Sequence, residues 1–184
     1  MAGMNSTRRK LAISTWSAPS EGNIFGKLVV DATQMQPYLD HVRARTGEKV
    51  TVTHLVGKAI ALALAKAPSL NGRILFGRYE PFDTVDVTYL VALDDGADLA
   101  KVKIDHLDRR PVEDVAAELR ARAQKLRKGQ DAEFEKSKGM LRVLPSFVLK
   151  PLLFVIGWLT AGLGVEVKAL GLEAFPFGSC IITS

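Results

Sequence analysis

The sequence predicts an α/β protein in which helices cover one face of a mixed sheet. The first observation is a broad apolar stripe over residues 51–67 that ends at Pro68, as expected of a buried helix. The second is strict alternation of apolar and polar residues over 99–104, which indicates a half-buried strand. The third is that predicted strands and helices do not alternate regularly, which favours a two-layer sandwich on a mixed sheet.

The length and composition are those of one soluble globular domain. The chain has 184 residues, of which 47% are hydrophobic and 24% are charged. Its single cysteine, Cys180, excludes an internal disulfide and favours a reducing, cytoplasmic location. The basic residues near the N-terminus are followed by no long apolar run, so no secretory leader is expected.

The positive charge does not by itself identify a partner. The net charge is +5 and the pI is near 9.4, but basic residues are spread along the chain and mixed with acids, which favours a solvated surface. Aromatic residues make up 7%, too few for the stacking platforms of a single-stranded nucleic-acid binder. No nucleic-acid partner is therefore expected. The sequence has no Cys-x-x-Cys or His-Glu-x-x-His spacing, so no metal is expected either.

Three elements are predicted before Pro68, after a loose end at residues 1–7. Residues 24–31 (I-F-G-K-L-V-V-D) predict a strand. Residues 32–45 carry apolar positions three to four residues apart, which predicts a helix. The helix over 51–67 begins at Thr51 or Thr53, because either side chain can cap its free amides.

Three strands and one helix are predicted between Pro68 and Gly129. The strands are expected over 73–79, 84–93 and 99–104, with a turn at 94–96 (D-D-G) before the last of them. The helix over 111–128 has Pro111 at its first position, acids in its first turn and bases in its last, which complements the helix dipole. Gly129 then supplies a left-handed cap.

Residues 140–167 form an unusual apolar segment. Lys150 divides it, and Pro145 and Pro151 are expected to break it further. A membrane-spanning helix needs about 20 apolar residues, more than the uninterrupted stretch 151–165 supplies. A helix in the core or at a subunit interface is therefore predicted, with a membrane-surface helix as the alternative. Residues 178–184 predict a last strand.

Four residues able to carry chemistry have plain structural interpretations. His41 is expected on a helix surface, and His54 at the start of a helix or in its packing. His106 precedes Asp108 by two residues, as a base precedes its orienting carboxylate, but such pairs are common in turns. Cys180 lies in an apolar strand, where its thiol is expected to stay protonated, which argues against a nucleophile.

Five stretches, in order, resemble the catalytic domain of dihydrolipoamide acyltransferases, the core subunits of 2-oxoacid dehydrogenase complexes, in the chloramphenicol acetyltransferase superfamily. They extend over nearly the whole chain. One is the helix of residues 51–72, which closes with Pro68, two residues and Asn71. Another is the strand pair of 85–104 around an aspartate–glycine turn. The others are 8–13 (R-R-K-L-A-I), 111–129 and 177–184 (F-G-S-C-I-I-T-S).

This resemblance implies a fold, an activity and partners. The fold is a chloramphenicol acetyltransferase-like two-layer sandwich over residues 8–184, with the apolar segment 140–167 inserted. The activity is transfer of an acyl group from a coenzyme A thioester to a thiol or other acceptor, without a metal. The partners are a lipoyl-bearing domain and further copies of the chain, in a homotrimer or larger assembly. Thr183 stands at the position of the family's oxyanion-stabilising hydroxyl, and Ser184 is the alternative if the register slips by one.

The sequence also departs from the family pattern. The family's catalytic motif is His-x-x-x-Asp or His-x-x-x-Asn, and none of the three histidines has Asp or Asn four residues later. The resemblance therefore implies a domain that is incomplete at its C-terminus, and we expect no acyl transfer by this chain alone. The alternatives are a non-catalytic scaffold that packs with full-length subunits and a membrane-surface protein that uses residues 140–167. The acyl donor, the acceptor and the coenzyme A contacts are left open.

Overall fold

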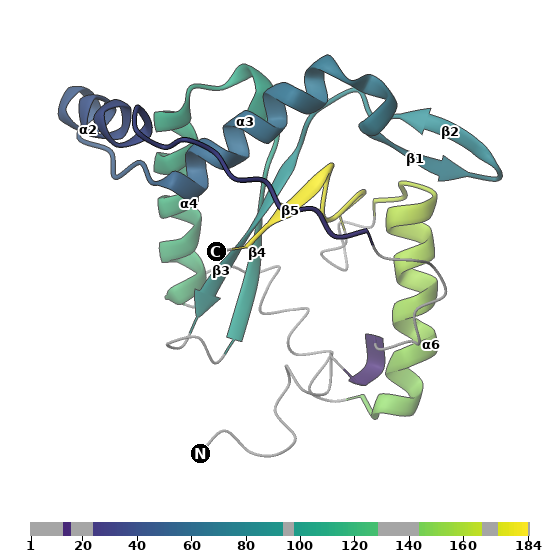
Figure 1. Cartoon of the computed structure of the whole chain (residues 1–184). Coiled ribbons are helices and arrows are strands. Elements are labelled where there is room, and N and C mark those ends of the chain that lie inside the picture. The colour runs from purple at the N-terminus through teal and green to yellow at the C-terminus, as the bar shows by residue number, and fades with distance from the viewer. Residues whose placement is uncertain (1–12, 16–23, 94–97, 129–143, 167–172, 184) are drawn as a thin grey trace.

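The computed structural model describes residues 13–15, 24–93, 98–128, 144–166 and 173–183. Figure 1 shows α6 standing apart from α2, α3 and α4. Short helical turns occur at Pro68–Leu70, Leu107–Arg109 and Trp158–Gly162. The longer helices are α2 (Met35–Thr46), α3 (Val52–Lys66), α4 (Val112–Arg127) and α6 (Ser146–Gly157), and the strands are β1 (Gly72–Leu75), β2 (Arg78–Pro81), β3 (Val87–Leu93), β4 (Asp98–Ile104) and β5 (Cys180–Ile182).

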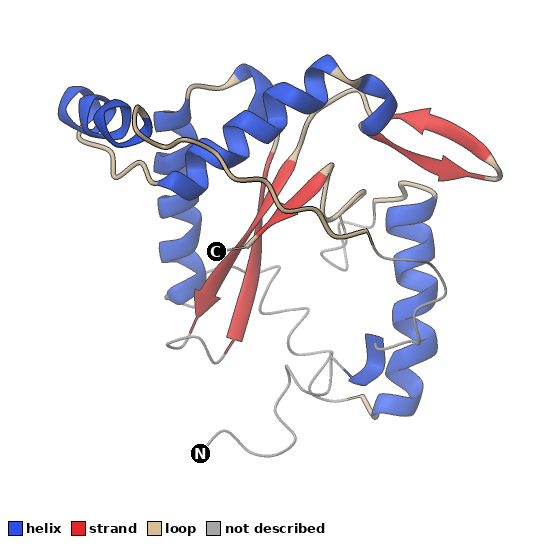
Figure 2. Cartoon of the chain, in the orientation of Figure 1, coloured by secondary structure: helices blue, strands red, loops and turns tan. Residues whose placement is uncertain are grey.

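The central sheet has the order β4-β3-β5 and is mixed, as predicted (Figure 2). Strands β3 and β4 are antiparallel, with a register that runs from Val87 opposite Ile104 to Leu93 opposite Asp98. The turn predicted between them at 94–96 lies outside the described residues. Strand β5 pairs with β3 in parallel, and this pairing ends where Ile182 meets Tyr89. Two segments far apart in the sequence are thus brought side by side.

Helices α3 and α4 pack on one face of this sheet and form the main core. The alternation predicted for 99–104 is confirmed, because Ala100, Val102 and Ile104 are all buried. They meet Ala61 of α3 and Val115 of α4 in one apolar cluster. The predicted α/β class, with helices on one face of a mixed sheet, is therefore confirmed. A second cluster joins α2 to the start of α4 and contains Leu39, Val42, Val50, Val112 and Ala116.

Both long predicted helices exist, with small differences at their ends. Thr51, one of the two predicted caps, is the N-cap of α3 and forms a capping box with His54. Pro111 is the N-cap of α4 and not its first helical residue, so the predicted start is one position too early. The predicted cap Gly129 lies outside the described residues.

Two strand predictions are wrong. Residues 24–31 do not form a strand, and Ile24 and Phe25 are 98% and 91% exposed. Their apolar pattern is typical of a strand, but no strand among the described residues pairs with their backbone. Residues 73–79 do not form one strand either, because the chain reverses at Phe76 and Gly77, which both have positive φ. The result is the β1–β2 hairpin.

Helix α6 also differs from expectation, because it runs through both Lys150 and Pro151. Proline removes a helical hydrogen bond to the carbonyl of Phe147, and Phe147 is largely exposed, so water can replace that bond. Leu149 is fully buried on the inner face, whereas the outer face exposes Phe147, Phe154 and Trp158. No helix among the described residues is long and apolar enough to cross a membrane.

Candidate functional site

Tyr89 is the centre of the candidate site, because β3 carries its ring to the face of the sheet that α3 and α4 cover. The side chain is 2% exposed, and its hydroxyl has no hydrogen-bond partner among the described residues. The ring ends against Gly57 of α3, where an added Cβ would lie 2.0 Å from the hydroxyl oxygen. Only glycine leaves room for this ring, so Gly57 and Tyr89 form one packing unit.

His54 lies in the first turn of α3, beside Tyr89. Thr51 donates its backbone N–H to His54 Nδ1 at 3.0 Å, and the Thr51 hydroxyl lies 2.8 Å from the same nitrogen. Because Nδ1 accepts a hydrogen bond, the neutral imidazole carries its hydrogen on Nε2. Burial lowers the pKa of His54, which favours this neutral form. The prediction of a helix-start histidine is confirmed, and the ring presents an additional N–H donor.

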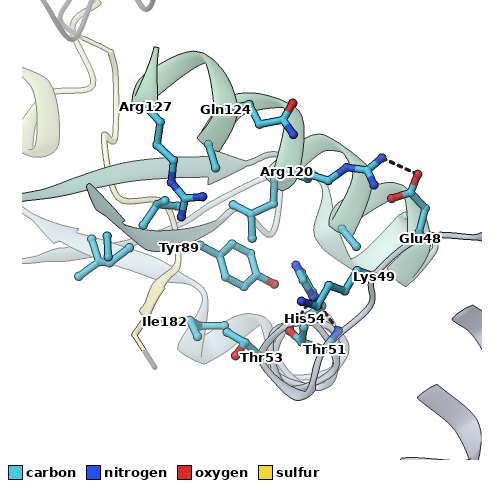
Figure 3. A pocket seen from close by; sticks show the side chains of 16 residues that line it. Glu48, Lys49, Thr51, Thr53, His54, Tyr89, Arg120, Gln124, Arg127 and Ile182 are labelled. Carbon is cyan, nitrogen blue, oxygen red and sulfur yellow. Dashed lines mark hydrogen bonds and ion pairs between the residues drawn. The ribbon is translucent and has the colours of Figure 1, made fainter. Parts of the chain in front are cut away.

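A cavity of about 420 Å³ opens in front of these two side chains. Figure 3 shows the Tyr89 hydroxyl directed toward His54. The ring centroids of the two side chains are 6.2 Å apart. Residues 89–92 of β3 form one wall, and the face of α4 that carries Ala116, Leu119 and Ala123 forms the other. The apolar lining consists of Leu90, Val91, Ala92, Ala116, Leu119, Ala123 and Ile182.

The charged side chains of the cavity leave an excess of positive charge. Arg120 donates to Glu48 Oε1 at 2.9 Å, while Glu48 Oε2 is buried without a partner. Lys49 and Arg127 also line the cavity, and neither forms an ion pair with a described residue. Burial, with a smaller contribution from Cys180, raises the pKa of Tyr89 to about 12. Its hydroxyl therefore remains a hydrogen-bond donor at neutral pH.

The predicted oxyanion hydroxyl lies at the end of β5, next to this cavity. Ile182 lines the cavity, and Thr183, which follows it directly, is exposed and is not part of the lining. Ser184, the alternative, lies outside the described residues. Parallel pairing with β3 fixes the position of β5 up to Ile182. The structure thus places Thr183 at an accessible strand end, and no histidine among the described residues forms a hydrogen bond with it.

Cys180 and the remaining histidines are not brought together into a catalytic arrangement. Burial raises the pKa of the Cys180 thiol, in agreement with the predicted inert thiol. His41 is exposed on α2, as predicted. His106 donates its backbone N–H to Asp86, and the carboxylate of Asp108 pairs with Arg109 at 3.6 Å. No group of three or more metal-ligating side chains occurs in the described part of the chain.

Sequence reasoning missed Lys58, which lies one turn beyond His54 on α3. Its ammonium group donates to the carbonyls of Leu107, Asp108 and Arg110 at 3.0, 2.8 and 2.7 Å. It thereby ties the connection between β4 and α4 to the helix that carries His54. A lysine inside an apolar helix pattern was the available signal, but its three carbonyl partners lie about fifty positions away in the sequence.

Comparison with protein families gives one match. The model described as 2-oxoacid dehydrogenases acyltransferase (catalytic domain) matches residues 14–143. No curated protein sequence matches the chain.

Three solved structures match part of this chain. Dihydrolipoamide acetyltransferase from Azotobacter vinelandii is 27% identical over 54% of this chain and 42% of its own, with a TM-score of 0.49. A probable dihydrolipoamide acetyltransferase from Listeria monocytogenes is 26% identical over 55% and 44%, with a TM-score of 0.49. A truncated catalytic core of the 2-oxoacid dehydrogenase multienzyme complex from Thermoplasma acidophilum is 30% identical over 55% and 47%, with a TM-score of 0.46. The chain spans less than half the length of each of these structures.

Proposed function

We propose that this chain, which belongs to the family of 2-oxoacid dehydrogenase acyltransferase catalytic domains, acts in acyl transfer from a coenzyme A thioester to a thiol or other acceptor. The observation that carries the proposal is the family match over residues 14–143, most of the chain. The matched region contains α2, α3, the central strands β3 and β4, and α4. It therefore includes the framework on which Thr183 is positioned.

In this proposal the Thr183 hydroxyl stabilises the oxyanion that develops when the acceptor attacks the thioester carbonyl. A donor placed at such an oxygen is worth about 3 kcal/mol of barrier. Two features support this role: the side chain is exposed, and it directly follows a strand that is held in parallel register by β3. Removing the hydroxyl should therefore lower turnover without affecting the fold.

We also propose that the protein works in a homotrimer or larger assembly, in which a histidine that does not belong to these 184 residues supplies the base. None of the three histidines in these 184 residues has the family's spacing, so none of them is expected to act as the base. The exposed apolar side chains of residues 24–30 and of α6 support association with further subunits. A lipoyl-bearing domain as acyl acceptor and a cytoplasmic location belong to the same proposal.

The test measures acetyl transfer from acetyl coenzyme A to dihydrolipoamide by the protein in the assembly purified from its source. Thr183→Val keeps the side-chain shape and removes the hydroxyl, and we expect it to lower kcat by about two orders of magnitude. Thr183→Ser keeps the hydroxyl and should retain most of the activity. Equal activity of all three forms would remove Thr183 from the mechanism. An assembly with a histidine-bearing partner but no turnover would instead favour a non-catalytic scaffold.

A further inference from the structure

We propose that the cavity between α3, β3 and α4 binds a small monocarboxylate with an apolar body, such as a medium-chain alkanoate. The proposed site does not use the Thr183 hydroxyl, because the lining includes Ile182 but not Thr183. The proposal therefore does not rest on acyl transfer and can fail or succeed by itself. It rests on the donors at one end of the cavity, the apolar walls and the charge of the lining.

Three side chains at one end of the cavity, those of Tyr89, His54 and Lys49, can each donate a hydrogen bond. The Tyr89 hydroxyl is buried and unpartnered, which is an uncommon state that costs free energy until a partner arrives. His54 presents Nε2–H, because its Nδ1 is occupied by Thr51. Figure 3 shows Lys49 on the same side of the cavity as His54. A ligand group rich in acceptors, such as a carboxylate, suits this end.

The rest of the cavity suits an apolar body. Val91 of β3, Leu119 and Ala123 of α4, and Ile182 of β5 all contribute apolar side chains to the lining. The volume of about 420 Å³ falls in the range of roughly 300–1,000 Å³ that is typical of small-molecule sites. An alkyl chain between β3 and α4 would remove apolar surface of these side chains from water.

The charge of the lining selects an anion over a cation. Glu48 is the single acidic side chain of the lining, and Arg120 neutralises it at 2.9 Å. Lys49 and Arg127 remain without ion pairs among the described residues, so two positive charges are uncompensated. Figure 3 places Arg127 and Lys49 on opposite sides of Tyr89. Because Lys49 shares its end with the donors of His54 and Tyr89, we expect the anionic head at that end.

The first experiment titrates octanoate into the full 184-residue chain and follows heat and amide NMR shifts. We expect saturable binding, with shifts at Tyr89, Leu119 and their neighbours. Octan-1-ol, which lacks the charge, should bind at least about tenfold more weakly, and octylamine should not bind. Absence of saturable octanoate binding, or equal affinity for octan-1-ol, would overturn the proposal.

Variants then test whether the ligand occupies this cavity. Tyr89→Phe removes only an unpartnered hydroxyl, so the fold should persist while octanoate affinity falls about fivefold, as one lost hydrogen bond predicts. Lys49→Gln should weaken binding, whereas Lys125→Gln, a matched exposed lysine of α4 outside the lining, should not. Ala123→Phe should fill the cavity and abolish binding. If both Tyr89→Phe and Lys49→Gln bind octanoate like the unchanged chain, the assignment to this cavity is wrong.

Discussion

Replacing Lys58 by methionine removes the ammonium group that holds the connection between β4 and α4 against α3. The change keeps a long, unbranched side chain on the helix, and methionine has a helix propensity similar to that of lysine. What disappears is one donor group with three carbonyl partners, on Leu107, Asp108 and Arg110. The variant therefore isolates the contribution of these hydrogen bonds from that of packing.

The expected loss of stability follows from the state of the three carbonyls after the change. All three bonds are partly buried, and an unsatisfied buried acceptor costs about 1–3 kcal/mol. Because Lys58 is only half-buried, water can reach part of the site, so we take the lower bound of about 1 kcal/mol for each carbonyl. The free energy of unfolding should therefore fall by about 3 kcal/mol, well above the change expected from a lysine-to-methionine substitution at an exposed position.

The assay is urea unfolding followed by far-UV circular dichroism. With a slope of about 2 kcal/mol per molar urea, the midpoint should move down by about 1.5 M. Lys66→Met is the matched control, because Lys66 lies exposed in the last turn of the same helix. Its loss removes only a favourable interaction with the helix dipole, worth about 0.5 kcal/mol.

A second measurement separates local from global effects. Leu107 donates its backbone N–H to the carbonyl of Val85 at 2.9 Å, directly beside the carbonyls that Lys58 holds. Hydrogen exchange at this amide should accelerate in Lys58→Met more than exchange in the middle of β4. A midpoint that shifts no more than in Lys66→Met, with unchanged exchange at Leu107, would refute the assigned role of Lys58.

Three further predictions concern packing, pH and association. Gly57→Ala should lower thermal stability by about 1–3 kcal/mol despite the better helix propensity of alanine, because its Cβ would lie 2.0 Å from the Tyr89 hydroxyl, and Tyr89→Phe should restore part of the loss. Burial lowers the pKa of His54 below its usual 6.5, so the unfolded chain binds the proton first and stability should fall as pH drops through that value. His54→Gln, which can keep the cap, should reduce this pH dependence in thermal unfolding, whereas His41→Gln should not. Phe154→Ser on the outer face of α6, where Phe154 is 75% exposed, should shift self-associated chain toward smaller species in size-exclusion chromatography.

Elements whose signals are local could be predicted closely from the sequence. The helix α4 has its apolar face, its acidic first turn and its basic last turn within the same sixteen residues. Strand β4 carries its own alternation, and Ala100, Val102 and Ile104 are buried as that alternation requires. In both cases the information needed to form the element is contained in the element itself.

Elements that depend on distant partners could not be predicted in this way. A strand needs a neighbour for its backbone groups, and the apolar pattern of residues 24–31 gives no information about whether one exists. The hairpin at Phe76 and Gly77 was not predicted, because the apolar run 74–76 is also typical of a single strand. Pro151 was expected to break the apolar segment, yet α6 runs through it, because the freed carbonyl of Phe147 can reach water.

The candidate site shows the same limit at the level of single residues. His54 was correctly placed at a helix start, but its proximity to Tyr89 depends on how α3 crosses β3, and this crossing depends on the absence of a side chain at Gly57. Because a glycine in an apolar helix weakens that helix, its presence there indicates a close contact, although not with which residue. The unpartnered Tyr89 hydroxyl results from the way α3, β3 and α4 pack together, and no single element determines it. The ligand proposed for this cavity therefore depends on the three-dimensional structure, whereas the proposed acyl-transfer chemistry depends on membership of the family.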